Sequence, residues 1–100
     1  MKKLLCKYYL DCRYDSRASF YNKAQVEHFE DGTKILTSYS TVVAVIKNDR
    51  AFINGFYSQT TTRHIKEFLR QNGFKVDSIK QMSTDYMIED SQFRSLITSY

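Results

Sequence analysis

The sequence predicts an α+β fold, in which an antiparallel sheet of four or five strands forms a meander and is followed by two or three α-helices. Segments with strand character follow one another through the first half of the chain, separated by short turns and without helical patterns between them. The β-branched run TVVAVI at 41–46 is typical of a strand covered on both faces. Amphipathic helical spacing then starts near residue 60 and recurs up to the C-terminus.

Five strands are expected, at 3–11, 20–30, 33–39, 41–47 and 51–53. In the first, apolar residues at even positions alternate with charged ones at 3, 7 and 11, which predicts a half-buried strand with Cys6 facing inward. Asp31-Gly32 predicts a tight hairpin after the second strand, because glycine accepts the positive φ of such turns. Asn48-Asp49 predicts the turn before the last strand. The run at 41–46 is the best candidate for a central strand.

Helices are expected at 60–72, 78–88 and 91–99, and the first should pack on one face of the sheet. In this first helix Ile65, Phe68 and Leu69 form an apolar stripe, and Gly73 ends it. Asp77 or Ser78 is expected to cap the second helix. We expect residues 1–100 to form a single domain, since a hundred residues provide one hydrophobic core.

Charge is unevenly distributed along the chain. Residues 1–76 carry thirteen Lys and Arg against seven Asp and Glu, whereas residues 77–100 carry two against four, and the net charge is +4. A basic body suits nucleic acid or an acidic partner, although a modest positive charge also serves solubility alone. No apolar run approaches the ~20 residues of a membrane span, and Lys7 interrupts the N-terminal apolar stretch of a would-be signal peptide. We therefore expect a cytosolic protein without a membrane partner.

Two cysteines and two histidines match the ligand count of a zinc site, but their spacing does not. Cys6 and Cys12 lie six residues apart, which is roughly 20 Å along a strand, while His28 and His64 come from separate elements. The sequence has neither a glycine-rich phosphate loop nor a complete zinc-deaminase signature. We expect no metal, no cofactor and no catalytic residues, while a nucleophilic pair of a cysteine with His64 stays open as an alternative.

Three consecutive threonines, at 60–62, stand directly before the first helix. Ser58 or one of the threonines is expected to cap the helix, which leaves the other hydroxyls without an assigned role. In one interpretation they only fix the connection from strand to helix. In the other, they join the free amides of the helix start, with Arg63 and His64, in binding a carboxylate or phosphate of a partner.

The basic stripe of the same helix and exposed tyrosines complete the candidate surface, because Tyr and Arg dominate the energetics of many protein interfaces. The alternative is that the stripe follows a nucleic-acid backbone or is merely solvated. The residues expected to contact a partner are Thr60, Thr61, Thr62, Arg63, His64, Lys66, Arg70, Tyr57 and Tyr39.

The segments LTSYSTVVAVI at 36–46 and GFYSQTTTRHIKEFLRQNGF at 55–74 resemble a domain of unknown function. That domain is found in small proteins of phages, plasmids and conjugative elements of Gram-positive bacteria. The resemblance covers residues 14–76, and it is specific in the order and spacing of its motifs. It implies a setting rather than a reaction, since small proteins of mobile elements commonly act on host machinery.

The resemblance therefore implies a non-catalytic accessory protein that inhibits a host defence factor by direct binding in the bacterial cytoplasm. Anti-CRISPR proteins are one such class, which makes a Cas nuclease such as Cas9, or its guide-RNA complex, the candidate partner. We expect a monomer or a weak homodimer. Two alternatives stay open, a small nucleic-acid-binding protein that uses the basic helix face and a structural role in a virion or conjugation complex.

Overall fold

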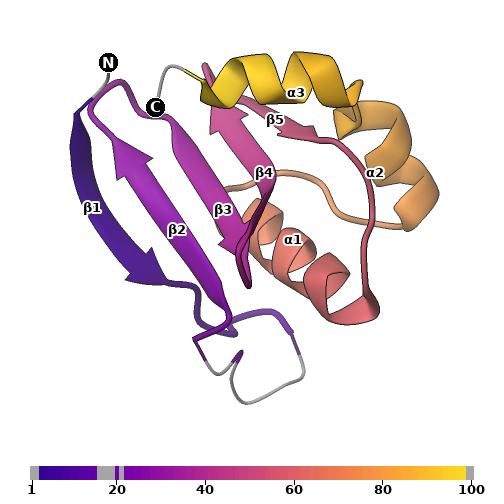
Figure 1. Cartoon of the computed structure of the whole chain (residues 1–100). Coiled ribbons are helices and arrows are strands. Elements are labelled where there is room, and N and C mark those ends of the chain that lie inside the picture. The colour runs from indigo at the N-terminus through magenta and orange to yellow at the C-terminus, as the bar shows by residue number, and fades with distance from the viewer. Residues whose placement is uncertain (1–2, 16–19, 21, 99–100) are drawn as a thin grey trace.

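The computed structural model describes residues 3–15, 20 and 22–98. A five-stranded antiparallel sheet is followed by three helices, which confirms the predicted fold class (Figure 1). The strands lie in the sheet in the order in which they occur in the chain, so each pairs with its sequence neighbours. The elements are β1 (Leu4–Tyr9), β2 (Ala24–Phe29), β3 (Lys34–Ser38), β4 (Thr41–Lys47), β5 (Arg50–Ile53), α1 (Gln59–Gln71), α2 (Ile79–Tyr86) and α3 (Asp90–Ile97).

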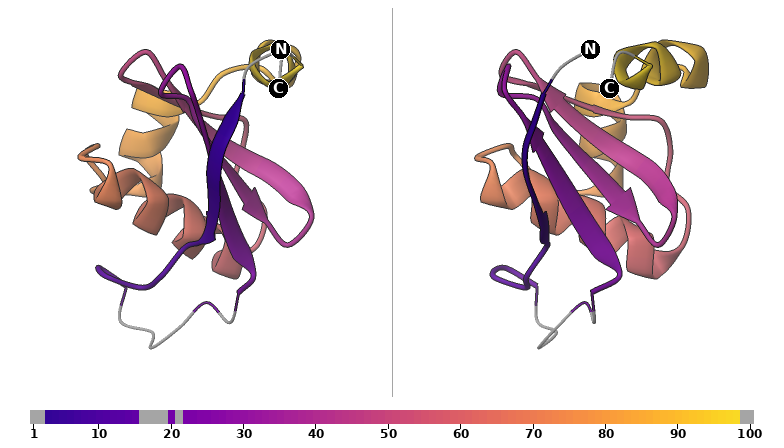
Figure 2. Two further views of the ribbon diagram at one scale, coloured as in Figure 1. Left: turned by 90° about the vertical axis from the view of Figure 1, so that its left-hand side faces the viewer. Right: turned by 60° about the vertical axis from the view of Figure 1, so that its left-hand side comes forward.

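The helices cover the two faces of the sheet unequally. α1 and α2 lie on one face, and α3 crosses part of the other (Figure 2). The larger core, between the sheet and α1 and α2, contains Val26, Leu36, Ala44, Ile53, Ile65, Phe68, Leu69 and Met82 among others. The smaller core, under α3, consists of Phe29, Ile35, Val45 and Phe93. β4 contributes to both, and its four consecutive buried residues at 43–46 agree with the predicted strand covered on two faces.

β1 differs from its prediction. All six of its residues are exposed, and Cys6 faces solvent instead of the core. β1 is an edge strand, and the large core contains none of its residues, whereas the next residue, Leu10, is buried. The alternating pattern therefore marked a strand correctly, but the predicted burial of Cys6 was wrong because no helix among the described residues covers this end of the sheet.

The helix ends follow local sequence signals. Ser58 caps α1 and Ser78 caps α2, each through its hydroxyl, which accepts a backbone N–H three residues further on. After α1, Gly73 adopts a φ of 82°, as expected for a residue that stops a helix. α3 has no side-chain cap, and Ser99, the last residue of its predicted range, lies outside the described residues.

The three hairpin turns between β2 and β5 all contain positive φ angles, and two of these turns were predicted from sequence. Between β2 and β3, the N–H of Phe29 donates to the carbonyl of Thr33 (2.8 Å), which closes a three-residue loop whose Gly32 has a φ of 88°. Between β4 and β5, Asn48 and Asp49 form a two-residue loop with φ angles of 53° and 62°. This is the conformation of a type I′ turn, in which the second position favours glycine.

We expect Asp49→Gly to raise the free energy of unfolding by up to about 1 kcal/mol, because glycine adopts positive φ without a Cβ penalty. Part of this gain is offset by the greater freedom of glycine in the unfolded chain. Asp49→Ala is the matched control and should destabilise, since alanine retains the Cβ and lacks the tolerance of aspartate for this region. Urea denaturation of the three proteins tests the order Gly, Asp, Ala.

Candidate functional site

The threonines at the start of α1 are tied to the protein itself. Thr61 donates its N–H to the Ser58 hydroxyl (3.1 Å), and the Thr62 hydroxyl donates to the Ser58 carbonyl (2.9 Å). The Thr61 hydroxyl lies 3.0 Å from the hydroxyl of Ser38 on β3, and Thr61 is buried. Thr61 therefore holds the helix start against the sheet, whereas Thr62 bonds within the first turn of the helix. Thr60 is half-buried.

His64 lies inside the protein. Its Nδ1 is 2.8 Å from the Ser38 hydroxyl, and its ring packs edge-on against Phe20 and close to Tyr39. A hydroxyl beside an imidazole can act as a nucleophile only where a substrate reaches it. Ser38 and His64 are 2% and 0% exposed, so this pair serves the packing of α1 on β3. His64 thus does not belong to the surface on which it was expected.

Four predicted residues of α1 border a hollow, which we call the basic hollow. It has a volume of about 390 Å³ and lies between α1 and the loop that follows β1. Its lining consists of Tyr14, Asp15, Gln59, Thr62, Arg63, Lys66 and Arg70. Three cations and one carboxylate give it a net positive charge, so it can accept an anionic group.

The wall of the basic hollow is held in place by an ion pair. Arg63 Nη1 lies 3.3 Å from Asp15 Oδ1, and the two side chains are 31% and 12% exposed. Lys66 is half-buried and Arg70 is exposed, with its Nη2 3.4 Å from the carbonyl of Val76. Arg63 therefore shapes the hollow, whereas Lys66 and Arg70 contribute its other positive charges.

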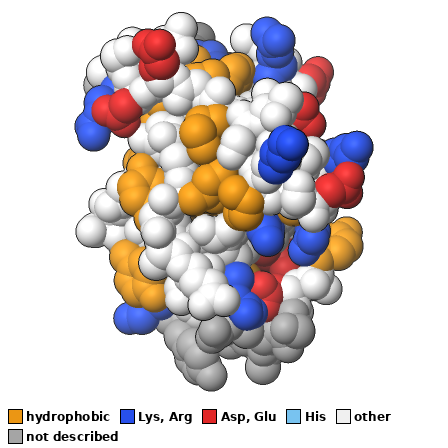
Figure 3. Space-filling model, turned by 90° about the vertical axis from the view of Figure 1, so that its right-hand side faces the viewer, with side chains coloured by type: hydrophobic (Ala, Val, Ile, Leu, Met, Phe, Trp, Pro, Cys, Tyr) orange, Lys and Arg blue, Asp and Glu red, His pale blue; other side chains and the backbone are white. Residues whose placement is uncertain are grey.

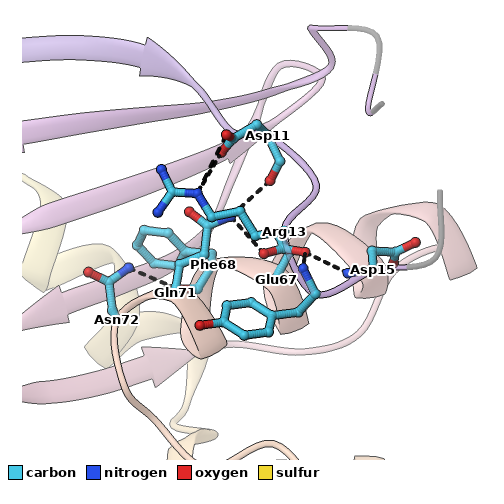
Figure 4. Close-up of polar contacts among 8 residues, drawn as sticks. Asp11, Arg13, Asp15, Glu67, Phe68, Gln71 and Asn72 are labelled. Carbon is cyan, nitrogen blue, oxygen red and sulfur yellow. Dashed lines mark hydrogen bonds and ion pairs between the residues drawn. The ribbon is translucent and has the colours of Figure 1, made fainter. Parts of the chain in front are cut away.

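Glu67, on α1, anchors the loop that follows β1, as Figure 4 shows. One carboxylate oxygen accepts the N–H groups of Tyr14 and Asp15, both at 2.8 Å, and the other accepts Gln71 Nε2 at 2.6 Å. Gln71 Nε2 also donates to the carbonyl of Asp11 (2.8 Å). Glu67 is 1% exposed, and three N–H donors compensate the cost of burying its charge. The loop at 11–15 is thus fixed to α1 by a buried carboxylate.

The two predicted tyrosines lie apart from the basic hollow. Tyr57 is exposed, donates its hydroxyl to Asn54 Oδ1 (2.8 Å), and lines a different pocket of about 260 Å³ beside α3. Tyr39 is 59% exposed and occupies the turn between β3 and β4 with a φ of 58°. Positive φ is unusual for a bulky residue. The structure therefore brings together Thr62, Arg63, Lys66 and Arg70, but not the tyrosines.

Asp90 holds the first turn of α3. It accepts Arg94 Nε (2.7 Å) and Asn54 Nδ2 (2.8 Å), and these hydrogen bonds hold the pKa of its carboxyl below the ordinary value of 3.8. The same bond to Asp90 raises the pKa of the Arg94 guanidinium. A carboxylate at a helix N-terminus is also favoured by the helix dipole.

Because the folded-state pKa of Asp90 is lowered, its stabilising effect is present above pH 3.8 and is lost as the pH falls through the lower folded value. We therefore expect the difference in melting temperature between the wild type and Asp90→Asn to be largest near neutral pH and to shrink in acid. Thermal unfolding across this range measures it. Asp49→Asn, at an exposed turn, is the control. A difference independent of pH would contradict the assignment.

The four residues considered for zinc do not come together. Cys6 and His28 lie opposite one another on β1 and β2, whereas Cys12 is half-buried beyond β1 and His64 is in the core. Among the residues that the structure describes, no three His, Cys, Asp or Glu side chains converge as ligands would. In the same part of the chain, no helix is long and apolar enough to cross a membrane.

Asp15 and Gln59 of the basic hollow were missed from sequence, and so were three residues that hold the site in place. Glu67 and Gln71 are spaced i, i+4 on α1, and this spacing was a signal that their side chains contact one another. Ser38 carries no such signal, because its contact with Thr61 joins residues 23 apart in the chain.

The model of one protein family, described as a family of unknown function (DUF8033), matches residues 8–85. The matched range contains β2–β5, α1 and the basic hollow, and it ends before α3. No curated protein and no solved structure matches the chain.

Proposed function

The chain belongs to the DUF8033 family of unknown function, and from its own surface we propose that it is a non-catalytic protein that binds an acidic surface of a host protein. The basic hollow carries this proposal. Lys66 and Arg70 supply positive charge on the exposed side of α1, and Arg63 with Asp15 shapes the wall beside them. Carboxylates of a partner fit such a site, since Arg and Lys pair with them across interfaces.

Rigidity of the hollow supports the proposal. α1 is fixed by three fully buried side chains, Ile65, Phe68 and Leu69, and the opposite wall is fixed by Glu67. A partner then binds without paying to order the backbone, which favours affinity for a surface of limited area.

The charge pattern favours a protein over a nucleic acid as the partner. On the side of the molecule seen in Figure 3, Lys and Arg side chains are interspersed with Asp and Glu, and hydrophobic side chains form a separate group. A nucleic-acid site usually has a continuous basic stripe that follows the phosphates. Here one of the three cations of the hollow already faces Asp15.

The proposed mode of action is inhibition by occupancy, with a Cas nuclease such as Cas9 as the candidate partner on the grounds of the resemblance to mobile-element proteins. Binding alone suffices for this activity. The burial of Ser38 and His64 agrees with it, because that hydroxyl–imidazole pair has no access to a substrate.

A charge-reversal series tests the proposal. Lys66→Glu with Arg70→Glu should abolish inhibition of target-DNA cleavage by the guide-RNA-loaded nuclease and weaken binding by about tenfold or more, as expected for reversed charges at a complementary interface. Arg50→Glu with Lys80→Glu, at exposed positions outside the hollow, changes the net charge equally and should retain both.

Three results would contradict the proposal or its candidate partner. Inhibition that survives reversal of Lys66 and Arg70 places the contact elsewhere. Binding to bare DNA, with a steep salt dependence that both variant pairs reduce, supports the nucleic-acid alternative instead. Absence of any effect of the wild type on the nuclease removes this partner, and affinity capture from a nuclease-treated lysate then tests whether a different host protein requires Lys66 and Arg70.

A further inference from the structure

The two edge strands of the sheet differ in whether another segment pairs with them. At the β5 edge, Ile53 forms a parallel bridge with Met87, and the Ile88 N–H donates to the Ile53 carbonyl (2.9 Å). Nothing in the described part of the chain pairs with the outer edge of β1. All six residues of β1 are exposed, and Lys7 is its one charged residue. An open, apolar edge presents unpaired backbone groups and is typical of a strand that pairs with another chain.

The hydrogen bonds of β1 identify which of its backbone groups point outward. The Leu10 N–H donates to the Ala24 carbonyl (2.9 Å), and Tyr8 lies opposite Val26, two positions along the same ladder. In an antiparallel pair, every second residue directs both backbone groups to its partner strand. Tyr8 therefore bonds to β2, and Lys7 and Tyr9 direct their N–H and C=O groups to the open edge.

We propose that β1 pairs antiparallel with β1 of a second copy, with the two-fold axis at Tyr8, to form a continuous ten-stranded sheet. A two-fold axis that makes the strands antiparallel stands perpendicular to the sheet, so each residue can face only residues on its own side. The axis must then pass through a residue of β1, and three residues near its middle are available, Cys6, Lys7 and Tyr8.

Charge and backbone geometry select Tyr8 among these three. An axis at Lys7 would place two lysines directly opposite one another, which destabilises a strand pair. An axis at Cys6 would require Leu5, which lies where the register shifts by a bulge, to pair with Lys7 of the second copy. With the axis at Tyr8, the two Tyr8 rings are cross-strand neighbours, and Lys7 exchanges both backbone hydrogen bonds with Tyr9 of the second copy.

The proposal does not rest on the proposed function. The basic hollow is lined by α1 and the loop after β1, whereas the pairing uses β1 itself, so each copy keeps its own hollow. An extended strand of a different protein is the competing occupant of this edge, and it predicts a monomer in solution.

A charge-swap experiment at position 8 tests both the pairing and its register. Tyr8→Glu and Tyr8→Lys should each weaken self-association by about tenfold or more, because a like charge then faces itself across the axis and the aromatic pair is lost. An equimolar mixture of the two variants should associate again as a heterodimer, since only an axis at this residue brings the glutamate opposite the lysine. Tyr14→Glu, at an exposed position off the strand, is the control and should dimerise as the wild type does.

Analytical ultracentrifugation over a concentration series is the measurement, and circular dichroism verifies that each variant is folded. A wild type that stays monomeric at every concentration overturns the proposal and favours a foreign strand as the occupant. Dimers that persist in both single variants place the interface elsewhere. Failure of the mixture to associate rejects the register.

Discussion

Leu69→Ala should lower the free energy of unfolding by about 2 to 5 kcal/mol, the range for a buried leucine replaced by alanine. Leu69 is 0% exposed and belongs to the larger core, where α1 meets the sheet. The truncation removes three carbon atoms from a packed region and leaves a cavity. Because no described helix other than α1 and α2 covers this face, the lost contacts are not replaced.

Chemical denaturation gives the free energy, and Ile79→Ala provides the matched control. Ile79 is an apolar helical residue of equal size but 43% exposed, so its truncation should cost less than about 1 kcal/mol. Equal losses for the two variants would mean that the apolar stripe of α1 is not the main support of the fold.

Glu67→Gln should destabilise the protein by about 2 to 3 kcal/mol, although it replaces only one carboxylate oxygen by an NH₂ group. The glutamine oxygen can still accept the N–H groups of Tyr14 and Asp15, but its NH₂ then faces the NH₂ of Gln71. Rotating the Gln71 amide removes that conflict and leaves the Asp11 carbonyl opposite an oxygen. No arrangement of the two amides satisfies every group, so a buried polar group loses its partner.

The expected loss can be traced to the loop at 11–15. Hydrogen exchange of the Tyr14 and Asp15 amides should accelerate more than that of β3 or β4, since Glu67 accepts both N–H groups directly. Glu89→Gln, at the exposed cap of α3 without a side-chain hydrogen bond, is the control and should change stability by less than about 0.5 kcal/mol. Similar effects at both positions would refute the anchoring role.

Local patterns predicted the order and type of the strands and helices, because the physics that decides them is local, although the strand expected at 20–30 begins only at Ala24. The β-branched run of β4, the Asn48-Asp49 turn and the hydroxyl of Ser78 each act on residues close in sequence. The exposure of β1 was not predictable in this way. A strand that a helix covers could have the same alternating residues. Only the placement of α1 and α2 over other strands leaves the residues of β1 exposed to solvent.

Part of the candidate site was predictable from sequence, because helical spacing is also a local property. Helical spacing placed Arg63, Lys66 and Arg70 on one side of α1, and the structure joins them in one hollow. The same spacing could not show that His64 faces the sheet. There its ring forms a hydrogen bond with the hydroxyl of Ser38, which lies on β3 and 26 residues earlier in the chain. The loop that completes the hollow depends on Glu67, whose partners lie more than fifty residues earlier in the chain.

The division of the core into a larger and a smaller cluster has a consequence for the dynamics of the chain. α3 is a helix of eight residues without a side-chain cap, and Phe93 is its one buried residue. Its detachment would break the smaller cluster and leave the larger one whole, so it can open as a separate cooperative unit without global unfolding. Such an opening would uncover Ile35 and Val45 for a time that is set by the stability of α3 alone. The described elements within residues 8–85, the range that matches the family, would remain folded while this small helix exchanges between attached and detached states.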